Sequence, residues 1–176
     1  TGDDNVYIGT SAGKASTTAA GNVAIGKDAM KIGAQTSSNG GQNSVVGYGA
    51  YVDGTGQRNA ILGYRAAYTS TSANSNVAIG YEAGQKNTTG DSNVFIGNKA
   101  GPSSTSTDSN KLYINNNEGT PLIGGDFAAF QVHMNANVGI GNTNPQAKLH
   151  LSAGSSSEPV LLIENTNADN TPPTNA

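Results

Sequence analysis

The chain has 176 residues and a formal net charge of −3, with 12% charged residues, 6% aromatic residues and no Cys. Nine Lys and Arg residues against twelve acids provide no positive surface for nucleic acid, and the lack of Cys excludes disulfides and thiolate metal sites. No apolar run approaches the roughly 18 residues of a membrane span, and large apolar residues are too few for one deep globular core.

A short motif recurs along the first hundred residues and divides this region into an array of units. Each copy reads Asn, three mostly apolar residues and Gly, as in Asn5–Gly9, and an Ala stands three residues after every Gly. The copies are spaced by 17, 21, 16, 17 and 17 residues, so the longer second step predicts a loop insertion at residues 32–41. They begin at Asn5, Asn22, Asn43, Asn59, Asn76 and Asn93.

Each unit is predicted to form one coil of a parallel β-solenoid or β-roll. The apolar residues of the motif are two apart and often β-branched, which is typical of a strand. Gly ends the strand where the chain turns or approaches another backbone closely, and the polar stretch returns the chain. We therefore expect an all-β fold, a repetitive parallel β-solenoid that is followed by a small β cap or transition region.

The period of two also predicts which side chains fill the core. We expect the apolar residues on either side of each strand's middle position to point inward and to stack from coil to coil, with the repeated Ala beside them. The repeated Gly should mark strand ends or corners. The predicted inward residues are Val6, Ile8, Val23, Ile25, Val46, Leu62, Val77, Ile79, Val94 and Ile96.

The pattern changes after Gly101, and this change suggests three regions. Residues 1–101 are predicted to form the repeat array, residues 102–151 a transition or cap region, and residues 152–176 a C-terminal strand and linker. The first residues nearly repeat a stretch of the sixth unit, so we expect a fragment that begins inside a repeat and continues beyond its C-terminal linker.

Further strands are predicted after the array. Residues 111–115 resemble a degenerate last strand of the stack, and residues 121–125 and parts of 127–134 read as strands of the cap or transition. Residues 137–141 echo the repeat motif once more, and residues 159–165 are predicted to form a final strand.

Two features of these residues resemble known fibrous proteins. The units N-V-x-I-G-x-x-A-G resemble repeats of bacteriophage tail fibres, and they are also similar to head repeats of trimeric autotransporter adhesins, which have an S-V-A-I-G core. Residues 137–151 are similar to the N-V-G-I-G-T-x-x-P-x-A-K-L-H-V signature that precedes the C-terminal region of many phage fibres. Because the second segment is the more specific, the resemblance favours a phage fibre.

The resemblance implies a structural segment of a phage tail fibre that is involved in host-surface attachment and is located in the virion. The alternative is a head segment of a bacterial trimeric adhesin at the cell surface. The implied partners are further copies of the chain in a parallel homotrimer, other virion fibre or baseplate proteins and a host-surface glycan, with no nucleic acid and no membrane insertion. The thin core of a single coil stack also favours three chains around one axis.

The sequence contains only partial matches to motifs for catalysis, phosphate binding or metal binding. Gly21–Lys27 matches the start of a P-loop, but Asp28 stands where the motif requires Ser or Thr, and the segment is itself an array unit. His133 and His150 lack metal-ligand spacing, although threefold symmetry could bring three copies of either together. No acid pair suggests glycosidase chemistry, and no regular Thr ladder suggests ice binding. We expect no catalytic residue, no cofactor and no metal, and hence no enzyme.

Three successive units place Tyr directly after the strand-ending Gly, at Tyr48, Tyr64 and Tyr81. Neighbouring β-strands lie about 4.8 Å apart, so these rings should align along one edge of the stack. Two interpretations remain open. The rings pack at the junction between chains, or they face outward and contact a receptor or glycan on the host.

Overall fold

The computed structural model describes residues 2–32 and 41–152, and within these ranges the chain is all-β with no helix. The chain divides into two compact units, residues 1–135 and 136–176. The strands are β1 (Val6–Ile8), β2 (Val23–Ile25), β3 (Ser44–Val46), β4 (Ala60–Leu62), β5 (Val77–Ile79), β6 (Val94–Ile96), β7 (Lys111–Ile114), β8 (Ile123–Asp126), β9 (Gln131–Met134), β10 (Val138–Ile140) and β11 (Leu149–Leu151).

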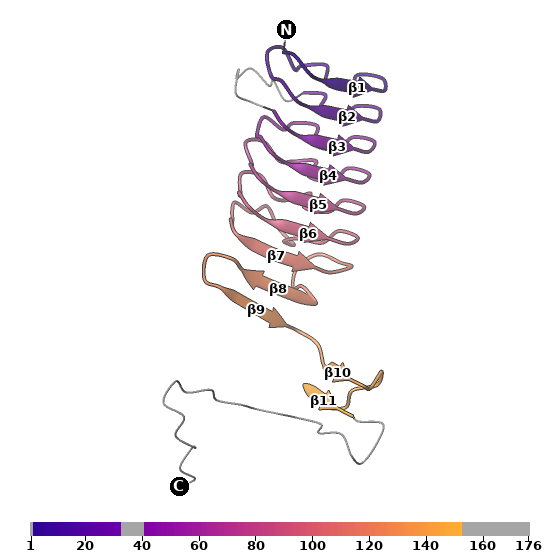
Figure 1. Cartoon of the computed structure of the whole chain (residues 1–176), viewed down its shortest axis with the longest axis vertical. Coiled ribbons are helices and arrows are strands. Elements are labelled where there is room, and N and C mark those ends of the chain that lie inside the picture. The colour runs from indigo at the N-terminus through magenta and orange to yellow at the C-terminus, as the bar shows by residue number, and fades with distance from the viewer. Residues whose placement is uncertain (1, 33–40, 153–176) are drawn as a thin grey trace, which may run out of the picture. The chain divides into compact units, whose positions relative to one another are not determined.

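The first unit is a parallel β-solenoid. Strands β1 to β7 stack in chain order, each parallel to the next, as Figure 1 shows. The register places each motif on the next without a slip, so Val77 lies beside Val94 and Ile79 beside Ile96. This architecture confirms the predicted all-β fold with a parallel β-solenoid, whereas the trimeric fibre stays a prediction. The loop insertion is predicted between β2 and β3, and residues 33–40 lie outside the described residues.

A ladder of buried asparagines, here called the asparagine ladder, runs through the solenoid at the start of each strand. The side-chain oxygen of each Asn accepts a hydrogen bond from the backbone N–H of the Asn one coil further on, at 2.8–3.1 Å. Its members beyond the first coil are at most 4% exposed: Asn22, Asn43, Asn59, Asn76 and Asn93.

The amide nitrogens of the same asparagines close each coil across its interior. The Asn59 amide donates to the Ala73 carbonyl at 2.9 Å and to the Tyr51 hydroxyl at 2.9 Å. The Asn76 amide likewise donates to the Gly90 carbonyl at 3.0 Å. Asn43, Asn59 and Asn76 therefore each join their strand to the turn of their own coil and to the next coil.

The predicted inward ladder is wrong, because the strands face the opposite way. The middle residue of each strand points inward, and Ala24, Val45, Ile61, Ala78 and Phe95 are at most 2% exposed. The reason is the asparagine ladder: because Asn points inward, the residue two positions later must also point inward. The flanking apolar residues therefore lie on the outer face of the sheet. The exposed ones are Val6, Ile8, Leu62, Ile79 and Ile96, and the half-buried ones are Val23, Ile25, Val46, Val77 and Val94.

Two positions fill the interior: the middle residue of the strand and the residue after the repeated Ala. Phe95 fills its coil with a ring that lies against Gly84, where an added Cβ would come within 2.7 Å of the ring. Where the strand contributes only Ala24, the buried Met30 occupies the interior instead. The repeated Ala is fully buried in every unit after the first, as expected, at Ala29, Ala50, Ala66, Ala83 and Ala100.

The repeated Gly marks the end of each strand, which confirms that prediction. Gly63 has a φ of +144°, and a Cβ there would lie 2.1 Å from the carbonyl oxygen of Gly80 in the next coil. The backbones approach so closely at this corner that only Gly fits.

The strand direction reverses at the C-terminal end of the solenoid. Strand β7 continues the parallel stack, whereas β8 and β9 pair antiparallel as a hairpin. These strands match the elements predicted at 111–115, 121–125 and within 127–134. The predicted region boundaries at 101 and 151 stay predictions.

The described part of the second unit contains the parallel pair β10 and β11, with Val138 beside Leu149 and Ile140 beside Leu151. Strand β10 coincides with the predicted echo of the repeat. The strand predicted at 159–165 lies outside the described residues.

We predict that Asn59→Ala destabilises the solenoid by roughly 3 kcal/mol, because it removes the acceptor of the buried Asn76 N–H and the donor to the Ala73 carbonyl. Urea unfolding followed by far-UV circular dichroism measures the loss. The control is Asn98→Ala, at an exposed position. Equal unfolding midpoints for the two variants would contradict a structural role of the ladder.

Candidate functional site: the tyrosine stack

The turn after each strand positions the tyrosines that the sequence analysis selected. A Gly directly follows each of β3, β4 and β5, and the next residue is Tyr48, Tyr64 or Tyr81. The backbone carbonyl of each Tyr accepts a hydrogen bond from the next coil, from Arg65 N–H to Tyr48 at 2.9 Å and from Glu82 N–H to Tyr64 at 2.9 Å. These bonds hold the three side chains in register.

The three rings form a continuous stack, here called the tyrosine stack. The centroids of Tyr48 and Tyr64 are 5.4 Å apart and those of Tyr64 and Tyr81 are 5.2 Å apart, with interplanar angles of 10° and 7°. The alignment predicted from coil spacing is therefore confirmed. Each ring is 42–47% exposed. Because the ring faces cover one another, the edges and hydroxyl groups are what the stack offers to a partner.

A cation extends the stack by one coil. Lys27 occupies the same position one unit earlier, and its ammonium lies 5.5 Å from the centroid of the Tyr48 ring. This contact is a cation–π interaction, worth about 0.5–1 kcal/mol at an exposed site.

A cavity of about 320 Å³ lies beside the stack. Its walls include Tyr48 and Tyr64 from the stack, and Arg65 and Tyr68 from the turn that follows Tyr64. The ion pair between Lys31 and Asp28, with a nitrogen–oxygen distance of 3.2 Å, borders the same space. The walls thus combine aromatic surface with charged groups.

Arg65 has a buried polar atom, Nε, that lacks a hydrogen-bond partner among the described residues. Its guanidinium carbon lies 4.2 Å from the centroid of the Tyr68 ring, so the packing of its planar group is fixed by an aromatic face. The sequence analysis selected neither Arg65 nor Tyr68, because the repeat motif does not specify either position. Their one signal in the sequence is that Arg65 directly follows Tyr64.

The other candidates from the sequence have structural settings. The P-loop-like segment Gly21–Lys27 contains strand β2 of the solenoid, as the repeat interpretation expects. His133 lies in β9, and His150 in β11 contacts the Asn142 amide at 3.1 Å. Over residues 2–32 and 41–152, no group of three or more His, Cys, Asp or Glu side chains could hold a metal ion. The same residues include no helix with the length and hydropathy of a membrane span.

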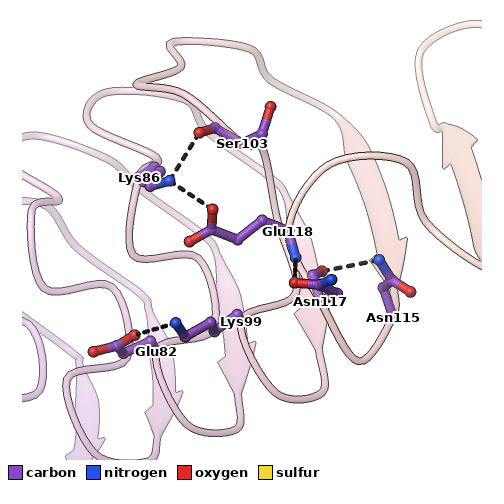
Figure 2. Close-up of polar contacts among 7 residues, drawn as sticks. All are labelled: Glu82, Lys86, Lys99, Ser103, Asn115, Asn117 and Glu118. Carbon is purple, nitrogen blue, oxygen red and sulfur yellow. Dashed lines mark hydrogen bonds and ion pairs between the residues drawn. The ribbon is translucent and has the colours of Figure 1, made fainter.

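Ion pairs tie together the coils near the end of the solenoid (Figure 2). The Lys86 ammonium donates to the Glu118 carboxylate at 2.7 Å and to the Ser103 carbonyl at 2.8 Å. The Lys99 ammonium lies 3.6 Å from the Glu82 carboxylate. The hydrogen bond from Lys86 lowers the pKa of Glu118. Exposed pairs of this kind add little stability singly.

Comparison with known protein families, with curated proteins and with solved structures finds no match to this chain. The resemblance of the motifs to phage fibres and adhesins therefore stays a prediction from the sequence.

The hairpin of β8 and β9, here called the transition hairpin, provides a test of stability at low pH. The Lys111 ammonium donates to the Asp126 carboxylate at 2.5 Å, and this bond, with the Ala129 N–H, lowers the pKa of Asp126. A lowered pKa stabilises the fold above the ordinary carboxyl range near pH 4, and the contribution is lost as the pH falls through the folded-state pKa. We predict that Asp126→Asn reduces the drop in urea midpoint between pH 6 and pH 2.5.

The control for this test is Asp4→Asn, which removes one exposed surface charge far from the hairpin. The drop in midpoint should remain close to that of the unmodified chain. If Asp126→Asn shows the full drop as well, the ion pair with Lys111 contributes nothing to acid sensitivity.

Proposed function

We propose that this chain is a structural, non-catalytic segment of a virion fibre, that it assembles as a parallel homotrimer, and that it takes part in attachment to the host surface. The observation that carries the proposal is the outer face of the solenoid sheet. The residues that flank each strand's middle position stack there in register, and all of them except Ser44 are apolar. We call these two rows the outer apolar ladders.

The outer apolar ladders are an unusual feature for an isolated chain. Leu62 is 50% exposed, Ile79 40% and Ile96 37%, and they follow one another along neighbouring strands. Single exposed apolar residues are ordinary, whereas a continuous apolar surface marks an interaction site. The face needs a partner that covers it along its whole length.

A second and third copy of the same chain fit that requirement best. The row after the middle position carries Ile, Val or Leu in every coil, and the row before it is apolar except at Ser44. An identical chain in parallel register therefore matches both rows coil by coil. Copies that meet around an axis bury the ladders of all chains in one shared core, which supplies the apolar burial that the thin interior of one solenoid lacks.

The transition hairpin and the second unit support the same assembly. Phe130 is 97% exposed and Val132 68% exposed on the hairpin. In the second unit, Ile140 and Leu149 of the β10–β11 pair are more than half exposed. Two short paired strands are marginal on their own in water, so the β10–β11 pair is expected to gain its core from other copies.

The location in a virion rests on the sequence. The repeat motif fits both phage fibres and the heads of bacterial adhesins, and residues 137–151 favour the phage fibre. Its partners would then include other fibre or baseplate proteins. Antibodies raised against the chain should decorate fibres on virions in immuno-electron microscopy; labelling of bacterial surfaces in uninfected cells would favour the adhesin instead.

Neighbouring residues of β5 allow a direct test of the trimer. We predict that Ile79→Asp leaves the coil interior intact but abolishes trimers, because the carboxylate replaces an outer-ladder side chain at the shared core. Ala78→Asp should instead unfold the array, because Ala78 is 1% exposed and its position faces the interior. Light scattering gives the mass and circular dichroism the fold. Unmodified protein that is folded and monomeric at micromolar concentration would refute the proposal.

Cross-linking keeps the test decisive if Ile79→Asp fails to fold. Because the chain has no Cys, Leu62→Cys introduces a single thiol on the outer ladder, where copies should form a disulfide on mild oxidation. The matched control is Thr71→Cys, at an exposed position on a turn of the same coil. Equal cross-linking of the two variants would contradict an interface along the outer apolar ladders.

A further inference from the structure

The cavity beside the tyrosine stack holds a cationic group, the Arg65 guanidinium, that no described carboxylate neutralises. Among the described residues, the Arg65 guanidinium forms no ion pair and its buried Nε donates no hydrogen bond. Buried donors are almost always paired, so an unpaired one requires an explanation. Tyr68 holds the guanidinium by stacking but offers its ring face rather than an acceptor.

The charged residues that line the cavity are two cations, Lys31 and Arg65, and one acid, Asp28, although the chain as a whole is negative. Lys31 borders the cavity, and Lys27 lies against the ring of Tyr48. Asp28 is the acid among the cavity walls, and it is already paired with Lys31. The balance of charge around the cavity therefore favours an anionic ligand in a protein whose net charge is −3.

The aromatic walls restrict the kind of anion. The faces of the stacked rings are largely covered by one another, so Tyr48 and Tyr64 present ring edges and hydroxyl groups. Neither of these hydroxyls has a hydrogen bond to another described residue. Such a wall suits a ligand with many hydroxyl groups and a carbon skeleton, and about 320 Å³ lies at the small end of ligand cavities.

We propose that this cavity binds a carboxylate-bearing sugar residue of an acidic surface polysaccharide. The two terminal amino groups of Arg65 pair with the carboxylate, because Nε is buried and these planar donors match two carboxylate oxygens. The hydroxyl groups of Tyr48 and Tyr64 bind the sugar hydroxyls, and Lys31 adds long-range attraction. This inference rests on the proposed attachment function and names the class of ligand for it.

The site is confined to one stretch of the array. Arg65 belongs to the β4 coil, and the corresponding positions in the neighbouring coils are Gly49 and Glu82. The coil register alone therefore does not require a cation here. A fibre with one such site per chain would present several copies together, which strengthens binding to a repetitive polymer.

Polygalacturonate and its fully methyl-esterified form are matched probes, because they differ only in the carboxylate charge. The full chain is passed over each immobilised polymer in surface plasmon resonance, with a phosphorylated mannan as a third surface. We expect binding to polygalacturonate, loss of binding at high salt and no binding to the methyl ester. Arg65→Gln should weaken binding by about tenfold or more, as expected for a lost charge-assisted contact.

Arg58→Gln is the matched control, because Arg58 is exposed and lies at the end of the preceding coil, outside the cavity. This variant should bind polygalacturonate as the unmodified chain does. Equal losses for both variants would indicate diffuse charge attraction and overturn the site, as would an unchanged affinity of Arg65→Gln. Binding to the phosphorylated mannan alone would overturn the assignment to a carboxylate, and lack of binding to all three surfaces would overturn the inference.

Light scattering on the same samples separates this inference from the proposed function. A trimer that fails to bind polygalacturonate refutes the saccharide site and leaves the fibre assembly standing. A folded monomer refutes the assembly, whatever its affinity for the polymer. Unchanged thermal melting of Arg65→Gln confirms that any loss of binding comes from the site and not from unfolding.

Discussion

The buried asparagine ladder is the constraint on which the solenoid depends. A polar amide inside a thin protein is stable only if its donors and acceptor are paired. Asn43, Asn59 and Asn76 each meet this condition by bonding to the next coil and to the turn of their own coil. A shift of register by one residue would unpair the whole ladder, so the repeat keeps one register despite steps of different length.

The ladder also determines which apolar residues lie outside. With Asn inside at the start of a strand and the close backbone contact at Gly63 ending it, a three-residue strand has one position left for the interior. That position varies in size from Ala78 to Phe95, because each coil adjusts its own packing. The positions on either side carry branched apolar side chains in every unit, except at Ser44 and Ala60. Such uniformity fits a surface that meets identical neighbours better than an interior that is packed coil by coil.

The sequence predicted the strands, their parallel order and the role of Gly, because these follow from period and repetition. It did not predict which face is buried, because a period of two is the same in either phase. The asparagine was the signal that could have decided the phase, since an Asn at the start of every strand needs a buried partner network. Hydrophobicity alone favoured Val77 and Ile79 for the interior, and this is where the prediction was wrong.

The candidate site was predictable only as far as it depends on the repeat. Tyr48, Tyr64 and Tyr81 share one position of the motif, so their stacking follows from the register. Arg65 and Tyr68 belong to the variable turn, where the chain's path decides which side chains meet, and no spacing rule brings them together. The solenoid thus separates two tasks: the repeated positions build the stack and its outer apolar face, whereas the variable turns are free to carry single groups such as the unpaired Arg65. Recognition of a ligand is therefore expected in these turns, because changes there leave the asparagine ladder and the close Gly contacts intact.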